Sequence, residues 1–153
     1  MPAIEMTVPE AHNVCPRALV IDDDPLVRDL TAEILRRAGY SVYLAADGID
    51  GMAQARALRP SLVITDIFMP QQDGIEVLRQ VKREMPGTRV VALSGGSPLL
   101  PRLDILTVAT KLGADAVLAK PFTPTELLAV ATANDWGPDS NVQAFSGPFR
   151  RSA

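Results

Sequence analysis

The sequence of 153 residues is 47% hydrophobic, and its 15 basic and 18 acidic side chains give a formal net charge of −3. This length suits one domain with one core, and the slight acidic excess without a basic run argues against direct nucleic-acid binding. The one cysteine, Cys15, cannot form an internal disulfide, and no apolar run is long enough to span a bilayer. We therefore expect a cytoplasmic protein without membrane insertion.

Strand and helix patterns begin to alternate at residue 18. Residues 18–21 are apolar at consecutive positions, which is typical of a strand buried on both faces of a parallel sheet. A helix is expected next, ended by Gly39, with a predicted apolar stripe of Val27, Leu30, Ile34 and Ala38. Residues 41–46 predict a second strand at the sheet edge, and residues 47–58 predict a second helix.

The middle of the chain repeats this alternation. Residues 61–64, which are apolar after Ser61, and residues 90–93 predict the third and fourth strands. Between them a helical stripe runs from the turn at Asp73-Gly74 to the turn at Pro86-Gly87; its members are Ile75, Leu78, Val81 and Met85. The sequence therefore predicts a third helix between two buried strands.

The last elements follow the same rule. Residues 100–112 predict a fourth helix, and residues 116–119 predict the fifth strand. Thr123 and Glu126 have the spacing of a capping box, so a final helix is expected to begin there and to run to about residue 134. Five strands then alternate with five helices, which predicts an α/β fold: a flavodoxin-like, doubly wound parallel sheet in the order 2-1-3-4-5.

This pattern divides the chain into three parts. Residues 17–134 form the predicted domain. Residues 1–16 precede it as an N-terminal extension that we expect to be flexible. Residues 135–153 follow it as a tail rich in turn-forming residues and without periodicity, and we expect this tail to be disordered.

Polar side chains stand at the ends of four predicted strands. Asp22 and Asp23 follow the first strand, Asp66 the third, Ser94 the fourth and Lys120 the fifth. The carboxyl ends of parallel strands meet at one edge of a sheet, where ligands bind, so we expect these side chains to converge. Crowded carboxylates need a compensating charge, and oxygen ligands favour Mg²⁺. Because an aspartate can act as a nucleophile toward phosphorus, the set is typical of phosphoryl transfer.

Four motifs in this order resemble the receiver domains of two-component response regulators, including the stand-alone chemotaxis regulators. The resemblance covers residues 17 to about 134. Its motifs are Val20-Ile21-Asp22-Asp23-Asp24-Pro25, Asp66-Ile67-Phe68-Met69-Pro70 with Asp73-Gly74 after it, Leu93-Ser94-Gly95, and Lys120-Pro121-Phe122. The predicted strand order is also that of this family.

The resemblance implies a phosphoacceptor and a metal site. Asp66 would accept a phosphoryl group from a phosphohistidine of a partner, either a histidine kinase or a phosphotransfer protein. Asp22, Asp23, Asp66 and the backbone carbonyl of Phe68 would bind Mg²⁺ (or Mn²⁺). Such a protein is a switch in a phosphorelay, with self-phosphorylation and self-dephosphorylation chemistry only, and is not a classical enzyme.

The resemblance also implies how the switch works. Ser94 would be the switch hydroxyl, and Lys120 would contact the phosphoryl group, with a cis bond to Pro121. A single-domain regulator of this kind would signal through contacts with a downstream protein whose identity the sequence does not give. Val117 departs from the pattern, because receivers usually carry an aromatic residue there.

Two further expectations come from other departures. The region of the fourth helix is richer in leucine than one buried stripe requires, which suggests a homodimer through this helix. Phe68 offers no side-chain hydrogen bond to water, so a long-lived aspartyl phosphate is expected.

Two alternatives stay open at this point. A haloacid dehalogenase-like phosphatase would use Asp22 as its nucleophile, with Asp24, Ser94 and Lys120 in support. A receiver-like scaffold that is not phosphorylated would use none of this chemistry. The first alternative is an enzyme, and the second is an interaction module.

Overall fold

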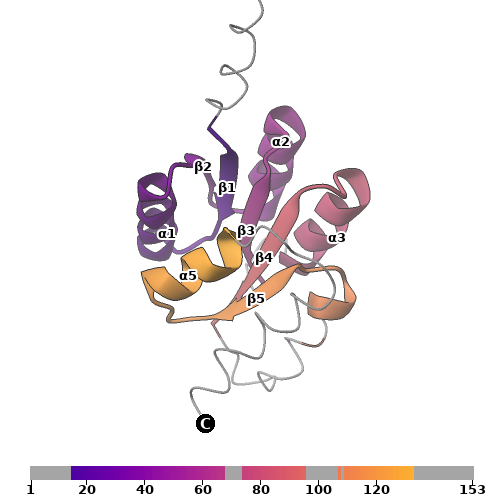
Figure 1. Ribbon diagram of the computed structural model, residues 1–153. Coiled ribbons are helices and arrows are strands. Elements are labelled where there is room, and N and C mark those ends of the chain that lie inside the picture. Colours follow the sequence, from indigo (N-terminus) through magenta and orange to yellow (C-terminus); the bar gives the residue numbers. More distant parts are fainter. Residues whose placement is uncertain (1–14, 68–73, 96–106, 108, 133–153) are drawn as a thin grey trace, which may run out of the picture.

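A five-stranded parallel sheet forms the centre of the protein (Figure 1). The computed structural model describes residues 15–67, 74–95, 107 and 109–132. The strand order is β2-β1-β3-β4-β5, as the alternation of elements predicted. The strands are β1 (Arg17–Ile21), β2 (Ser41–Ala45), β3 (Leu62–Asp66), β4 (Arg89–Ser94) and β5 (Ala116–Ala119).

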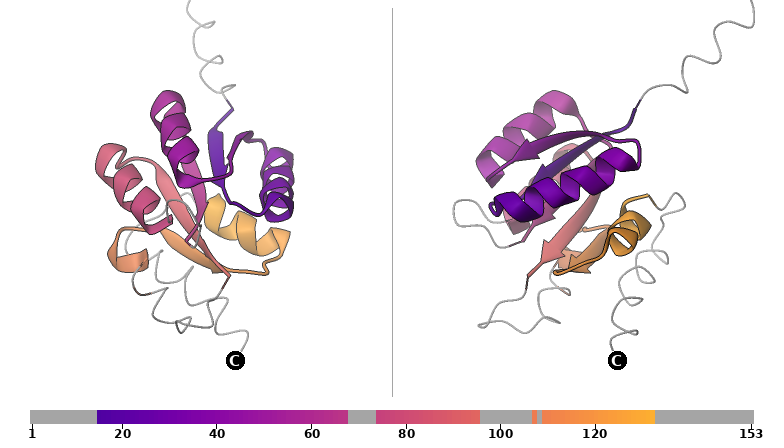
Figure 2. Two further views of the ribbon diagram at one scale, coloured as in Figure 1. Left: turned by 180° about the vertical axis from the view of Figure 1, so that it is seen from behind. Right: turned by 90° about the vertical axis from the view of Figure 1, so that its left-hand side faces the viewer.

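Helices cover both faces of the sheet, which makes it doubly wound (Figure 2). On one face lie α1 (Pro25–Arg37) and α5 (Pro124–Ala131), and on the other lie α2 (Gly48–Leu58) and α3 (Gly74–Glu84). Residues 107 and 109–111 are also helical, within the range where the fourth helix was predicted. The flavodoxin-like fold is therefore confirmed. None of the described helices is both long and apolar enough to cross a membrane.

The core consists of two layers because each central strand is apolar on both faces. Leu19 and Ile21 of β1 pack toward α2 and α3, while Ala18 and Val20 pack toward α1 and α5. All five residues of β3 are buried. Consecutive apolar residues thus place β1, β3 and β4 in the interior, and their carboxyl ends reach the same edge.

The face that α1 buries differs from the predicted stripe. Leu30 is 53% exposed, whereas Leu35 is fully buried. The contact strip also includes Thr31, whose Oγ1 donates to Val27 O at 2.7 Å and so satisfies its buried hydroxyl within the helix. The helix is therefore rotated about its axis relative to the predicted stripe, and Leu30 faces outward.

Several element ends also differ slightly from the prediction. The second strand ends at Ala45 and not at residue 46, and α5 ends at Ala131 before residue 134. The end of α5 is fixed by two side chains, because Arg89 Nη1 and Tyr40 Oη donate to Ala131 O at 2.7 and 3.2 Å. The predicted capping box of Thr123 and Glu126 is present.

Candidate functional site

Asp22 and Asp23 lie just beyond β1, where the backbone turns toward α1. Asp22 N donates to Ala45 O at 3.1 Å and so extends the contact with β2 by one residue. Its side chain is fully buried, and its Oδ1 accepts a hydrogen bond from Asp24 N at 3.0 Å. Asp23 is exposed. Asp24 caps α1, because its Oδ1 accepts from Leu26 N at 3.0 Å.

Asp66 is the last residue of β3 and is 6% exposed. The chain after it is tied to β4 by Ile67 N, which donates to Leu93 O at 2.9 Å. Gly74, the first residue of α3, packs directly against Asp66, and a Cβ at this position would lie 1.8 Å from Asp66 O. Only glycine allows this approach, so Gly74 helps to fix the backbone of the predicted phosphoacceptor.

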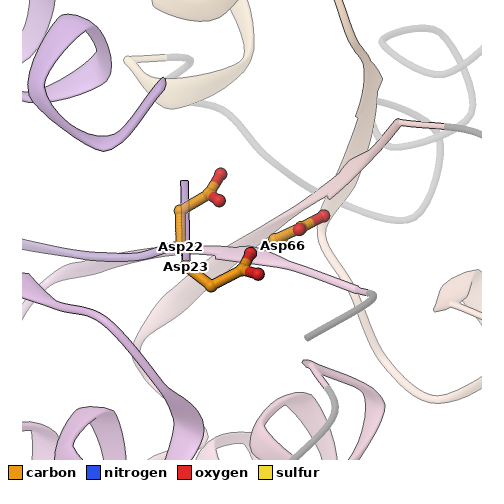
Figure 3. Close-up of side chains that lie close together, drawn as sticks. All are labelled: Asp22, Asp23 and Asp66. Carbon is orange, nitrogen blue, oxygen red and sulfur yellow. The ribbon is translucent and has the colours of Figure 1, made fainter. Parts of the chain in front are cut away.

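The three aspartates come together as one acidic group. One carboxylate oxygen from each of Asp22, Asp23 and Asp66 lies within 4.8 Å of the other two. Figure 3 shows the three side chains side by side at the carboxyl ends of β1 and β3. The sequence prediction that these side chains converge is thus met by the geometry, while their roles stay predictions.

Lys120 lies against this acidic group from the end of β5. Its Nζ is 3.0 Å from Asp22 Oδ2 and 3.5 Å from Asp66 Oδ2. The Lys120 backbone N donates to Ser94 O at 2.8 Å, and the Lys120–Pro121 peptide bond is cis, as expected. One ammonium group therefore bridges the two buried carboxylates.

Ser94 ends β4 at the same edge of the sheet. It is 1% exposed and pairs in register with Ala119 of β5. Val117 is also buried, in the core layer that faces α2 and α3. Phe68 and most of the leucine-rich stretch of the predicted fourth helix lie outside the described residues, so the predictions made for them stay untested.

Burial and charge together determine the ionisation of this site. Burial raises the pKa of Asp66 from its ordinary 3.8 to about 6; the nearby Lys120 opposes this rise, and the negative charge of Asp22 adds to it. Burial alone would lower the pKa of Lys120, but attraction to Asp66 and Asp22 outweighs it and raises the pKa. The site thus holds more negative charge than one ammonium group can balance.

A divalent cation fits the residues that are present. Three carboxylates against one ammonium leave two negative charges in excess. Asp22 Oδ2 is buried and, within the described part of the chain, accepts no hydrogen bond; Lys120 Nζ lies close to it but outside hydrogen-bonding geometry. Oxygen donors of this kind suit Mg²⁺. Asp22, Asp23 and Asp66 would hold such an ion.

Sequence reasoning missed two features of the site. Arg28 of α1 donates from its Nη1 to Asp22 O at 2.8 Å. A cavity of about 400 Å³ also opens beside Lys120, between α1 and the segment after β5. Its lining is Val27, Leu30, Gly95, Lys120, Pro121 and Phe122. The only sequence signal for the Arg28 contact was a basic residue placed shortly after the acidic turn.

Comparisons with known proteins agree with this geometry. The family model described as "Response regulator receiver domain" matches residues 18–132. "Response regulator MprA" of Mycobacterium sp. (strain KMS) is 37% identical over 135 residues, covering 84% of this chain and 57% of that protein. The "DNA-binding dual master transcriptional regulator RpaA" of Synechocystis sp. is 38% identical over 119 residues, covering 74% of this chain and 46% of that protein. The chain spans about half the length of these curated relatives.

The chain is also similar to a solved structure of a response regulator protein. It is a response regulator protein from Burkholderia pseudomallei, crystallised with a phosphorylated aspartic acid, a calcium ion and citrate. The match has a TM-score of 0.71 and 27% identity, and covers 84% of this chain and 71% of that one.

The raised pKa of Asp66 predicts that, in the absence of metal, this residue lowers the free energy of unfolding in a pH-dependent way. Because the folded state disfavours ionised Asp66, this residue lowers stability above about pH 6, and the cost fades as the pH falls toward 4. We expect Asp66→Asn to raise the free energy of unfolding by about 1 to 3 kcal/mol at about pH 7.5 in EDTA, and by much less at about pH 4.5. Urea denaturation at the two pH values measures this difference.

The exposed Asp29 provides the control for this measurement. Asp29→Asn should change stability little at either pH. A metal-free Asp66→Asn protein that is less stable than the parent at the higher pH would contradict the prediction.

The close approach of Gly74 to Asp66 predicts a strong effect of one methyl group. Gly74→Ala forces the start of α3 away from β3, and we expect a loss of about 1 to 3 kcal/mol in unfolding free energy. Gly87→Ala is the matched control, because no atom lies within 4 Å of its added Cβ; its effect should stay within about 0.5 kcal/mol. Urea denaturation of both variants tests this, and equal effects would disprove it.

Proposed function

The chain belongs to the response regulator receiver domain family, and we propose that it is a phosphorylation-controlled switch with Asp66 as its phosphoacceptor. Receiver domains are signalling switches that histidine kinases phosphorylate, and they bind Mg²⁺ at an acidic pocket. The observation that carries the proposal is the placement of Lys120 Nζ between the carboxylates of Asp22 and Asp66. This arrangement provides both a nucleophile and a cation for an incoming phosphoryl group.

The reaction transfers a phosphoryl group from nitrogen to oxygen. A carboxylate oxygen of Asp66 forms a bond to phosphorus while the phosphorus–nitrogen bond of the partner's phosphohistidine breaks, and the leaving imidazole takes up a proton. Mg²⁺, when bound by Asp22, Asp23 and Asp66, supplies positive charge that offsets the phosphoryl oxygens. Lys120 offers an ammonium group to one of these oxygens, and Ser94 offers its hydroxyl to another.

Phosphorylation would change the balance of contacts at this edge of the sheet. Lys120 now pairs with two carboxylates, and a phosphoryl group on Asp66 would draw it away from Asp22. Each new charge-assisted hydrogen bond contributes roughly 1.5 to 3 kcal/mol. A bias of this size shifts a two-state equilibrium by about one to two powers of ten, which is enough for a switch.

The surface beside the site favours a protein as phosphodonor. Leu26 and Leu30 of α1 are 76% and 53% exposed, although large apolar side chains are usually buried. The cavity next to them is lined by Val27 and Phe122, and Lys120 connects it to the acidic group. We propose that an apolar helical face of the phosphodonor, next to its phosphohistidine, packs on this surface.

Two finer expectations from the sequence belong to this proposal. The first is that the protein acts as a single domain through contacts with a downstream protein; the curated relatives are longer, and one of them is a DNA-binding regulator. The second is that the acceptor is Asp66 and not Asp22. The capping contact of Asp24 supports this, because a phosphatase mechanism would need the Asp24 carboxylate to face the nucleophile, whereas its Oδ1 accepts from Leu26 N.

Incubation with acetyl phosphate and Mg²⁺ tests the phosphoacceptor. Intact-mass measurement should show one added phosphoryl group on the parent protein and none on Asp66→Asn, because the substitution removes the proposed acceptor carboxylate. The exposed control Asp29→Asn should label like the parent. Labelling that persists in Asp66→Asn and is lost in Asp22→Asn would instead support the phosphatase alternative.

A comparison of two phosphodonors, a histidine kinase and acetyl phosphate, tests the docking surface. Leu30→Glu places a charge on the proposed contact, so transfer from a histidine kinase should slow by about tenfold, while labelling by acetyl phosphate stays unchanged. The kinase chosen for this experiment is the one that phosphorylates the parent protein fastest among a panel of histidine kinases. Ile49→Glu on α2 is the matched control, since Ile49 is also an exposed apolar residue. Equal slowing of both reactions by Leu30→Glu would argue against a docking role.

A further inference from the structure

The turn that carries the acid pair is held by a side chain from the helix that follows it. Arg28 lies on α1, and its Nη1 donates to the backbone carbonyl of Asp22 at 2.8 Å. This carbonyl belongs to the peptide unit that joins Asp22 to Asp23. The guanidinium group therefore fixes the orientation of the peptide plane from which Asp23 projects.

The two acids differ in how their positions are fixed. Asp22 is held by its own contacts, because its N donates to Ala45 O and its Oδ1 accepts from Asp24 N. Asp23 is exposed, and within the described ranges no hydrogen bond to its carboxylate is present. The direction of the Asp23 side chain thus depends on the backbone before it, and Arg28 is the side chain that holds this backbone.

We propose that Arg28 is a positioning residue for the divalent-metal site, and that it acts by holding the peptide between Asp22 and Asp23 so that the Asp23 carboxylate faces those of Asp22 and Asp66. The proposal rests on the proposed function, because it assumes that the three aspartates bind a divalent cation. Groups that orient metal ligands typically affect metal affinity by about 10- to 100-fold.

The charge of Arg28 makes the proposal unusually easy to test. A guanidinium group next to a cation site repels the cation, so electrostatics alone predicts that removal of Arg28 tightens Mg²⁺ binding. Loss of positioning predicts the opposite, because Asp23 would no longer be held in place. The sign of the change in affinity therefore separates the two effects.

Isothermal titration calorimetry of the full chain with Mg²⁺ measures the affinity. Arg28→Met keeps the aliphatic stem and removes both charge and donor, so we expect Mg²⁺ binding to weaken by about tenfold. Arg28→Lys keeps a charged donor on a long stem, and its affinity should stay within about threefold of the parent. Arg36→Met, on an exposed position of the same helix, should bind like the parent.

A second readout follows the turn itself without metal. In EDTA, we expect the backbone amides of Asp23 and Asp24 to exchange hydrogen faster in Arg28→Met than in Arg28→Lys, while amides of the β-sheet core stay unchanged. If Arg28→Met does not fold, Arg28→Gln replaces it, because its shorter side chain keeps a donor that does not reach the Asp22 carbonyl.

The outcomes separate this inference from the function on which it rests. Mg²⁺ binding that is equal or tighter in Arg28→Met, or unchanged exchange at Asp23 and Asp24, would overturn the positioning role alone. A parent protein that binds no Mg²⁺ and accepts no phosphoryl group would overturn both proposals.

Discussion

The crowding of three carboxylates around one ammonium group is the interaction on which the rest of this site depends. Asp22 and Asp66 are buried at the ends of adjacent strands, and Lys120 compensates only part of their charge. Burial, with the negative charge of Asp22 adding to it, keeps the pKa of Asp66 high. The charge imbalance would attract a divalent cation and would let Lys120 change partners when a phosphoryl group is added. Under the proposed function, metal binding and switching would therefore have the same electrostatic origin.

Much of this arrangement could be predicted from the sequence because the chain repeats one simple unit. Consecutive apolar residues identified the central strands, and parallel strands bring their final residues to one edge; hence Asp22, Asp66, Ser94 and Lys120 could be placed together. The expected stripe on α1 was wrong at Leu30 and Ala38, which are both exposed, because a helix with apolar residues on several sides does not specify its rotation.

Two contacts with the backbone could not be read from the sequence. Gly74 matters because Asp66 O lies where a Cβ would be, and Arg28 matters because it reaches the carbonyl of Asp22. Motifs record side chains, whereas these contacts depend on where carbonyl groups point after folding. Val117, where receivers usually carry an aromatic residue, is tightly buried and has no ring that could turn.

The hydrogen bonds that Arg89 and Tyr40 donate to Ala131 O have a mechanical consequence. Arg89 begins β4 and binds the last carbonyl of α5, while Ser94 ends the same strand at the opposite edge of the sheet. A force applied to the end of α5 would thus be transmitted to β4. One strand, β4, therefore connects Ser94, the predicted switch hydroxyl, to the side chain that anchors the end of the final helix.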